Sequence, residues 1–354
     1  MNSSSWDVII SGAGIIGVSL ALELRERGAQ VLILEKGDPG SEASSAAAGM
    51  LAPADPATPP ALRPLAMASA KMFPAYVQKL EAGARMQVDF RQLGTIELSA
   101  ETTAPHEYKS LSVDDLQRLE PSLKNHASSH LSEELCSFFV QEDSIDPRLL
   151  MQAALAAAKK IGIEIRGNAT VTNTTAREGK VEVISGGRFT AKSFVNCQGA
   201  WSGTPVRPRK GQMLYVHPKA SVLRHVLRTP EVYIVPRSTG KILIGASVED
   251  VGFDKSVEPE AVDMLLTLAQ HYLPELASAP ITQSWAGLRP GTPDDLPILG
   301  ATDIPGAFIA SGHFRNGILL APVTAQIMAD LIEGRTPSLD ISSFSPGRFS
   351  SKTV

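Results

Sequence analysis

The chain has 354 residues, of which 43% are hydrophobic, and its 33 basic and 37 acidic side chains give a net charge of −4. These values are typical of a globular protein long enough for one large or two interleaved domains, and they give no support to nucleic-acid binding. The two cysteines, Cys136 and Cys197, form neither a disulfide framework nor a metal cluster, so we expect a cytoplasmic protein without a bound metal.

The N-terminal segment MNSSSWDVII lacks the basic region of a signal peptide. The apolar stretch over residues 8–22 is too short and too interrupted by glycine and serine to cross a bilayer. We therefore expect neither secretion nor membrane association.

The strongest pattern lies in DVIISGAGIIGVSLALELRERGAQVLILEK, residues 7–36. A short buried strand leads into Gly12, Gly14 and Gly17, which have the G-x-G-x-x-G spacing, and a helix and a second strand that ends at Glu35 follow. Strand, glycine turn, helix and strand in this order predict a dinucleotide-binding unit.

Each part of this unit has a physical task. Gly12 permits a tight turn, Gly14 lets the backbone approach a pyrophosphate, and Gly17 lets the helix pack closely on the strand. The first helical turn offers free N–H groups to the phosphates. Glu35 follows Gly17 by 18 residues (35 − 17), where a carboxylate can accept hydrogen bonds from ribose hydroxyls and disfavours the 2′-phosphate of NADP. FAD and NAD both remain open at this point.

The segment EASSAAAGMLAP, residues 42–53, follows the second strand and consists mostly of small side chains. Such a segment lets a flat, bulky ligand lie against the backbone. It is equally typical of a small-residue helix that packs closely on a neighbour, and both interpretations stay open.

Further along the chain we expect a helix over residues 65–82, a short helix capped by Ser112, and a helix that begins near Asp146 and ends at Lys160. Short strands and turns alternate over residues 206–280. The pattern is therefore of the α/β type at both ends with sheet-rich pieces between.

These elements predict an α/β fold in which a Rossmann-like dinucleotide-binding domain is interleaved with a sheet-rich α+β substrate domain. We assign residues 1–75, 141–205 and 281–345 to the first domain, residues 76–140 and 206–280 to the second, and residues 346–354 to a tail.

Arg289 lies in SWAGLRPGTPDD, which we expect to be a loop bounded by glycine and proline. A guanidinium there suits bidentate binding of a carboxylate, although a structural arginine that bonds loop carbonyls is the alternative. Tyr233, on the strand EVYIVPR, can add a hydrogen bond to the same carboxylate or serve as a core tyrosine.

The segment NCQGAWSG ends a buried strand at Gly199 and Trp201. This position binds ligands in many α/β sheets, but it can also be a plain turn. The histidines show no metal spacing.

Four segments, GAGIIG with LILEK, SSAAAGML, WAGLRPGTPD and GHFRNGILLAP, resemble the D-amino-acid-oxidase superfamily of flavoproteins over nearly the whole chain. The glycine oxidases of bacterial thiazole and thiamine biosynthesis are its most similar members. The resemblance implies non-covalent FAD and oxidation of glycine, sarcosine or a small D-amino acid by hydride transfer from Cα to flavin N5. Molecular oxygen would reoxidise the flavin, and the products would be hydrogen peroxide, ammonia and a keto acid or glyoxylate.

The resemblance also implies roles for individual residues. Arg289 would hold the substrate carboxylate with help from Tyr233, and Arg315 would lie where substrate and flavin meet. The helix that begins after Arg315 would stabilise negative charge on the reduced flavin through its free N–H groups. The implied cofactor-binding residues are Gly12, Gly14, Ile15, Ile16, Gly17, Glu35, Lys36, Ser44, Ser45, Ala48, Gly49, Met50, Val171, Gly199, Trp201, His313, Phe314, Arg315, Asn316, Gly317, Ile318 and Leu319.

Several alternatives stay open. A D-amino-acid or proline dehydrogenase of the same fold would pass electrons to a quinone. An NAD-dependent dehydrogenase is supported by the first forty residues alone, and a flavin-binding domain would carry out no redox chemistry. A homo-oligomer is compatible with the sequence. Val248 stands where the best-known glycine oxidases have a pocket methionine, so the preference for glycine is open as well.

Overall fold

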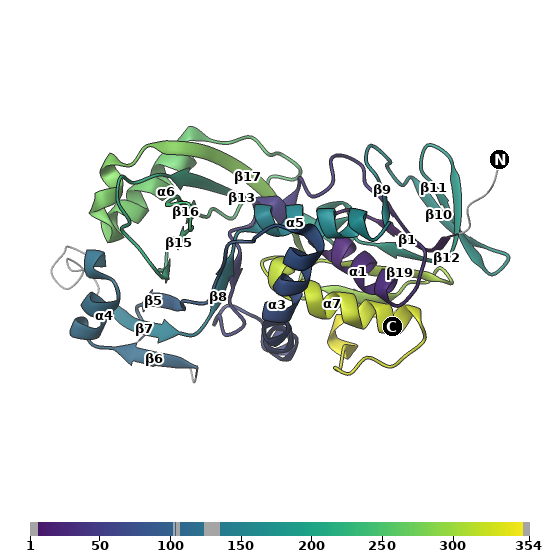
Figure 1. Cartoon of the computed structure of the whole chain (residues 1–354), viewed down its shortest axis with the longest axis horizontal. Coiled ribbons are helices and arrows are strands. Elements are labelled where there is room, and N and C mark those ends of the chain that lie inside the picture. Colours follow the sequence, from purple (N-terminus) through teal and green to yellow (C-terminus); the bar gives the residue numbers. More distant parts are fainter. Residues whose placement is uncertain (1–5, 102, 104–106, 124–134, 350–354) are drawn as a thin grey trace.

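The structure is a computed structural model that describes residues 6–101, 103, 107–123 and 135–349. Figure 1 shows an elongated molecule with one sheet and most helices in one half and a second sheet with α4 (Val113–Leu119) and α6 (Pro259–Tyr272) in the other. The predicted mixed α/β class is confirmed, and the described helices include none that is long and apolar enough to span a bilayer.

The first sheet has the strand order β10-β11-β12-β1-β2-β9, and β19 pairs with β12 and with β18. Because β1 runs parallel to β2 and β12, and β12 parallel to β19, all four strands end at the same edge of the sheet. The bounds are β1 Trp6–Ser11, β2 Val31–Leu34, β9 Glu164–Arg166, β10 Asn173–Arg177, β11 Lys180–Ile184, β12 Arg188–Asn196, β18 Ile298–Ala301 and β19 Ala307–Ser311.

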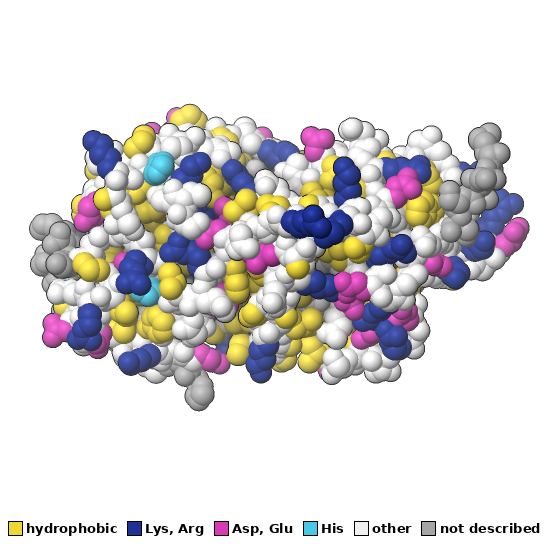
Figure 2. Space-filling model, in the orientation of Figure 1, with side chains coloured by type: hydrophobic (Ala, Val, Ile, Leu, Met, Phe, Trp, Pro, Cys, Tyr) yellow, Lys and Arg dark blue, Asp and Glu magenta, His cyan; other side chains and the backbone are white. Residues whose placement is uncertain are grey.

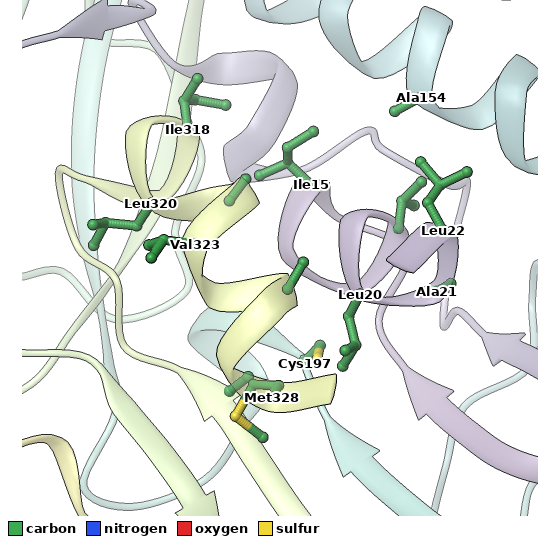
Figure 3. Close-up of a cluster of buried hydrophobic side chains, with 14 of the residues drawn as sticks. Ile15, Leu20, Ala21, Leu22, Ala154, Cys197, Ile318, Leu320, Val323 and Met328 are labelled. Carbon is green, nitrogen blue, oxygen red and sulfur yellow. The ribbon is translucent and has the colours of Figure 1, made fainter. Parts of the chain in front are cut away.

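Four helices pack in this half: α1 (Ile15–Glu26), α3 (Arg63–Ala84), α5 (Pro147–Lys160) and α7 (Gly317–Ile332). Their apolar side chains form one core with the inner face of the sheet. Figure 3 shows Leu20 of α1 near Cys197, with Met328 of α7 close by. The two ends of the chain are therefore held together by the helices that follow β1 and β19.

The helix predictions agree closely with these bounds. The helix expected over residues 65–82 extends over Arg63–Ala84, and α5 ends at Lys160 as expected. Asp146 caps α5 because its carboxylate accepts from the N–H groups of Arg148 and Leu149, and Ser112 caps α4 in the same way.

The second sheet has the order β17-β13-β16-β15-β14-β5-β7-β6. The helix α6 packs against it through a core that includes Leu214, Ile244 and Leu265. Residues 281–291, which the sequence analysis grouped with the first domain, form β17 and pair along their length with β13. The bounds are β5 Thr95–Ser99, β6 Tyr108–Leu111, β7 Cys136–Val140, β13 Arg207–Val216, β14 Val226–Arg228, β15 Tyr233–Pro236, β16 Ile242–Gly245 and β17 Ile281–Gly291.

A small sheet of order β3-β8-β4 joins the two halves, with the bounds β3 Met50–Leu51, β8 Asp143–Ile145 and β4 Phe90–Arg91. The short helix α2 (Ala43–Ala46) precedes β3 and lies against β17 and α5. In the predicted tail, Arg348 forms an ion pair with Asp294 at 2.8 Å, and residues 350–354 lie outside the described part. On the described part of the face in Figure 2, Lys and Arg side chains are interspersed with Asp and Glu.

Candidate functional site

A cavity of about 340 Å³ lies at the edge of the first sheet where β1, β2, β12 and β19 end. This volume is within the range of small-molecule and cofactor sites. The residues of the sequence prediction that line it are Gly12, Gly14, Ile15, Ile16, Glu35, Lys36, Ser44, Val171, Gly199, Trp201, His313, Phe314, Arg315, Gly317 and Ile318.

The glycine turn shapes one wall of this cavity. Gly12 has φ +109°, and a Cβ there would overlap the carbonyl of Cys197 at the end of β12. The N–H of Ile15 donates to Ser44 Oγ at 2.9 Å, so Ser44 occupies one donor of the first turn of α1. The N–H of Val18 donates to Gly14 O at 3.0 Å, and Ile16 of the same turn lines the cavity.

Glu35 and Lys36 line the cavity beside the glycine turn. Glu35 was expected to accept hydrogen bonds from ribose hydroxyls. In the structure its Oε2 accepts a hydrogen bond from Ala13 N at 2.7 Å, and its Oε1 accepts one from Gly37 N at 3.1 Å. The carboxylate thus fixes the glycine turn and keeps only its remaining lone pairs for a ligand. Burial lowers the pKa of Lys36, whose Nζ lies 3.1 Å from the centre of the Trp201 ring.

The beginning of α7 forms the remaining wall. Burial lowers the pKa of His313 to about 3, and its Nε2 lies 3.1 Å from Thr324 Oγ1, so the imidazole is neutral at ordinary pH. Positive potential on this side therefore comes from the Arg315 guanidinium and from the N-terminal N–H groups of α7, which begins at Gly317 after the N-cap Asn316.

Four of the predicted cofactor-binding residues line neither of the two cavities described here: Gly17, Ser45, Asn316 and Leu319. Gly17 packs against Gly12, where a Cβ would overlap the Gly12 carbonyl. The Ser45 hydroxyl donates to Gly40 O at 2.6 Å, and the carbonyl of Leu319 accepts from Ser69 Oγ. These contacts support the backbone around the cavity.

A second cavity of about 90 Å³ adjoins the first, with Phe314, Arg315 and Ile318 common to both. The second sheet contributes Tyr233 and Arg289 to its wall. The other predicted residues that line it are Ala48, Gly49 and Met50. Val248, in contrast, is 61% exposed and lines neither cavity.

Arg289 lies in the strand β17, so the expectation of a loop was wrong. Its Nη1 donates to Ser247 O at 3.1 Å and to Lys210 O at 3.4 Å, which fixes the plane of the guanidinium. Gly211 on β13 makes room for it, because a Cβ at Gly211 would overlap the guanidinium. Arg289 thus bonds backbone carbonyls and also lines the small cavity, and its binding of a carboxylate stays a prediction.

Sequence reasoning missed several residues that line the cavities. Met213 lines the small cavity, and its sulfur lies 3.5 Å from the Tyr233 hydroxyl. Gln198 and Ser11 line the larger one and are joined by a hydrogen bond of 2.6 Å. Cys197 also lines the larger cavity, and burial raises the pKa of its thiol. A neutral thiol is a poor nucleophile, which is consistent with a non-covalent cofactor. Nothing in the sequence indicated that Met213 lines a cavity, because its strand has the hydrophobic pattern of an ordinary core strand.

A buried ionic cluster lies around Arg228 on β14. Its Nη1 lies 3.1 Å from Glu142 Oε2, its Nη2 lies 2.6 Å from Glu97 Oε2, and its guanidinium also donates to the Tyr108 hydroxyl. Burial raises the pKa of Glu142 to about 7, with Arg228 opposing this shift and the neighbouring acids adding to it. Asp55 connects the cluster to the site, because its Oδ2 lies 3.9 Å from Arg228 and 3.6 Å from Arg315 Nη2.

The residues present fit a flavin dinucleotide. The glycine turn is a cradle that a Cβ would fill, helix N-termini lie at two walls, and an acid stands at the end of β2. Among the described residues, no group of three or more His, Cys, Asp and Glu side chains is arranged to hold a metal ion.

We predict that Gly12→Ala abolishes flavin retention, because the added Cβ forces β1 and β12 apart at the cavity wall. The ratio of flavin to protein absorbance after purification measures this. Gly28→Ala is the matched control: Gly28 has φ +92° but open space around its Cβ position, so the change costs about 1–2 kcal/mol of backbone strain and keeps the flavin. Normal flavin content in Gly12→Ala would contradict the assigned wall.

A second prediction concerns Glu142. Because its pKa rises from 4.5 to about 7 in the folded chain, the stability that its proton confers is complete below pH 4.5 and is lost as the pH rises through about 7. Glu142→Gln, which mimics the protonated acid, should therefore raise Tm relative to the parent chain at pH 8 by about 2 °C more than at pH 5. Thermal unfolding at both pH values measures this, with the exposed Glu101→Gln as control. An equal effect at the two pH values would contradict a buried, protonated Glu142.

Comparison with known proteins gives a consistent result. A family model described as FAD dependent oxidoreductase (DAO) matches residues 7–331. A glycine oxidase of Geobacillus kaustophilus is 33% identical over 368 residues, with 96% of each chain covered. The crystal structure of glycine oxidase from Geobacillus kaustophilus has a TM-score of 0.89 at 31% identity and covers 96% of this chain and 98% of its own.

The bifunctional protein ThiO/ThiG of Trichormus variabilis is 34% identical over 362 residues, which are 97% of this chain and 55% of that protein. This chain therefore spans about half the length of that relative. The family match decides between FAD and NAD, which the glycine spacing alone had left open. The chain belongs to the DAO family of FAD-dependent oxidoreductases, and FAD is its cofactor.

Proposed function

We propose that the chain is an oxidase of glycine or another small amino acid or amine, such as sarcosine or a small D-amino acid, with molecular oxygen as electron acceptor. The observation that carries this proposal is the small cavity beside the cofactor cavity, where Arg289 and Tyr233 converge. The similarity to glycine oxidases over nearly the whole chain supports it.

In this proposal Arg289 binds the substrate carboxylate. Its guanidinium keeps free N–H groups beyond those that bond the two carbonyls, because an arginine has five donors. The Tyr233 hydroxyl, which lies against the Met213 sulfur, donates a second hydrogen bond to the same carboxylate. The amino acid is thereby held by one end, and its Cα is turned toward the cofactor cavity.

When held in the larger cavity, FAD would supply a hydride acceptor for the oxidation of the substrate. The chain orients the reactants and excludes bulky substrates. Ala47 lines both cavities, and Ala46, Ala48 and Gly49 line the small one, so only small side chains stand on this wall. A volume of about 90 Å³ selects small side chains or none.

The ionisable side chains that line the small cavity are Tyr233, Arg289 and Arg315. None of them is a carboxylate or an imidazole, the groups that most often accept a proton in enzymes. The substrate amine must therefore enter the reaction in its neutral form. This requirement favours higher pH for turnover.

The experiment that tests the function is anaerobic reduction of the bound flavin by a panel of amino acids and secondary amines. We expect bleaching by glycine or sarcosine and weaker bleaching by amino acids with large side chains. Peroxide formation in air then identifies oxygen as the acceptor, whereas reduction without peroxide would support a quinone-linked dehydrogenase. A flavin that none of these compounds bleaches would overturn the proposal.

We predict that Arg289→Ala raises KM for glycine and sarcosine at least about tenfold, the loss expected for one charge-assisted contact. The KM of N-ethylmethylamine, which replaces the sarcosine carboxylate by a methyl group, should change much less. Arg209→Ala is the matched control, because Arg209 pairs with Arg289 across β13 and β17 but lines neither cavity. An equal loss for both kinds of substrate would rule out carboxylate binding by Arg289.

A further inference from the structure

Two guanidinium groups, those of Arg289 and Arg315, line the same small cavity. Two cations in about 90 Å³ would suit a substrate with two carboxylates, unless one of the charges is neutralised by the chain itself. The ion pairs of the two arginines therefore bear directly on which substrates the site accepts.

The two arginines differ in their partners. Arg289 bonds two backbone carbonyls, and within the described residues no carboxylate forms an ion pair with it. Arg315, in contrast, lies 3.6 Å from Asp55 Oδ2. The cavity thus has one arginine that is free to attract an anion and one that already faces a carboxylate.

Asp55 is held where it meets Arg315. Its Oδ1 accepts from Ala57 N at 2.9 Å, which leaves Oδ2 to face the guanidinium. The same Oδ2 lies 3.9 Å from Arg228, but that guanidinium is closer to Glu97 and Glu142. Because Arg228 has Glu97 as a closer partner and Asp55 Oδ2 lies nearer to Arg315, the charge of Asp55 acts mainly on Arg315.

On this basis, and resting on the proposed function, we propose that Asp55 is a specificity-determining residue. By pairing with Arg315, it leaves Arg289 as the single anchor for a carboxylate and makes the site select amines with one carboxylate over those with two. Asp55 acts here through Arg315 and touches neither substrate nor cofactor, so it is a positioning residue.

Sarcosine and iminodiacetate form a matched pair of probes, because both are secondary amines of acetic acid and only iminodiacetate has a second carboxylate. Asp55→Asn should raise the ratio of kcat/KM for iminodiacetate to that for sarcosine about two- to fivefold, the size of a partly exposed charge pair. Asp55→Glu, which restores the charge, should keep the ratio of the parent enzyme.

Two further variants separate Arg315 from the buried cluster. Glu97→Gln removes a carboxylate from Arg228 and leaves Asp55 in place beside Arg315, so the ratio should shift less than in Asp55→Asn. The double variant Asp55→Asn, Arg315→Gln should not show the increased preference for iminodiacetate, because it lacks the guanidinium that Asp55→Asn frees. An unchanged ratio in flavin-containing Asp55→Asn, or an equal shift in Glu97→Gln, would overturn the proposal.

If Asp55→Asn does not fold, Arg315→Gln alone still tests the inference. It leaves the Asp55 carboxylate unpaired near the cavity, so the ratio should fall, and a rise would contradict the pairing. Binding of malonate and acetate to the holoenzyme, measured by the change in flavin absorption, gives a readout without turnover. Tighter malonate binding in Asp55→Asn than in the parent enzyme would support the role of Asp55, even if no amine is oxidised. A failure to oxidise any of the amines would instead count against the proposed function.

Discussion

The parallel pairing of β12 with both β1 and β19 is the constraint on which the rest of the structure depends. Parallel strands end at one edge of a sheet, so the segments that follow β1, β12 and β19 meet there although they are far apart in sequence. The glycine turn, the Cys197–Trp201 segment and the start of α7 form the larger cavity as a direct result. The close approach of Gly12 to the Cys197 carbonyl shows how tightly this edge is packed.

The second sheet completes the site from the other side. The strands β13, β15 and β17 bring Met213, Tyr233 and Arg289 to the small cavity, and α2 and β3 supply its low-profile wall. The division of labour is physical. The first sheet positions backbone N–H groups at the larger cavity, and the second contributes the side chains that the proposed function assigns to substrate binding.

Several ionisable side chains that line the larger cavity are neutral or already have a partner. His313 is neutral because it is buried, the Lys36 ammonium is covered by the Trp201 ring, and Glu35 is engaged by backbone N–H groups. The full positive charges that line the small cavity are therefore those of Arg289 and Arg315, and one of them faces Asp55. The electrostatic character of the small cavity depends on this single pairing.

The sequence by itself determined the mixed α/β class and the positions of the main helices, because glycine spacing, caps and hydrophobic runs act over short distances. The family and the cofactor followed from its similarity to known proteins, since the glycine spacing left FAD and NAD open. The sequence also singled out most of the residues that line the cavities, through segments that resemble known flavoproteins. Only the tertiary structure decided the contacts of Arg289 with the carbonyls of Lys210 and Ser247, the contribution of Met213 to the small cavity and the pairing of Asp55 with Arg315. These contacts join segments tens to hundreds of residues apart, and no local pattern specifies which distant strand or loop will lie within hydrogen-bonding or ion-pair distance.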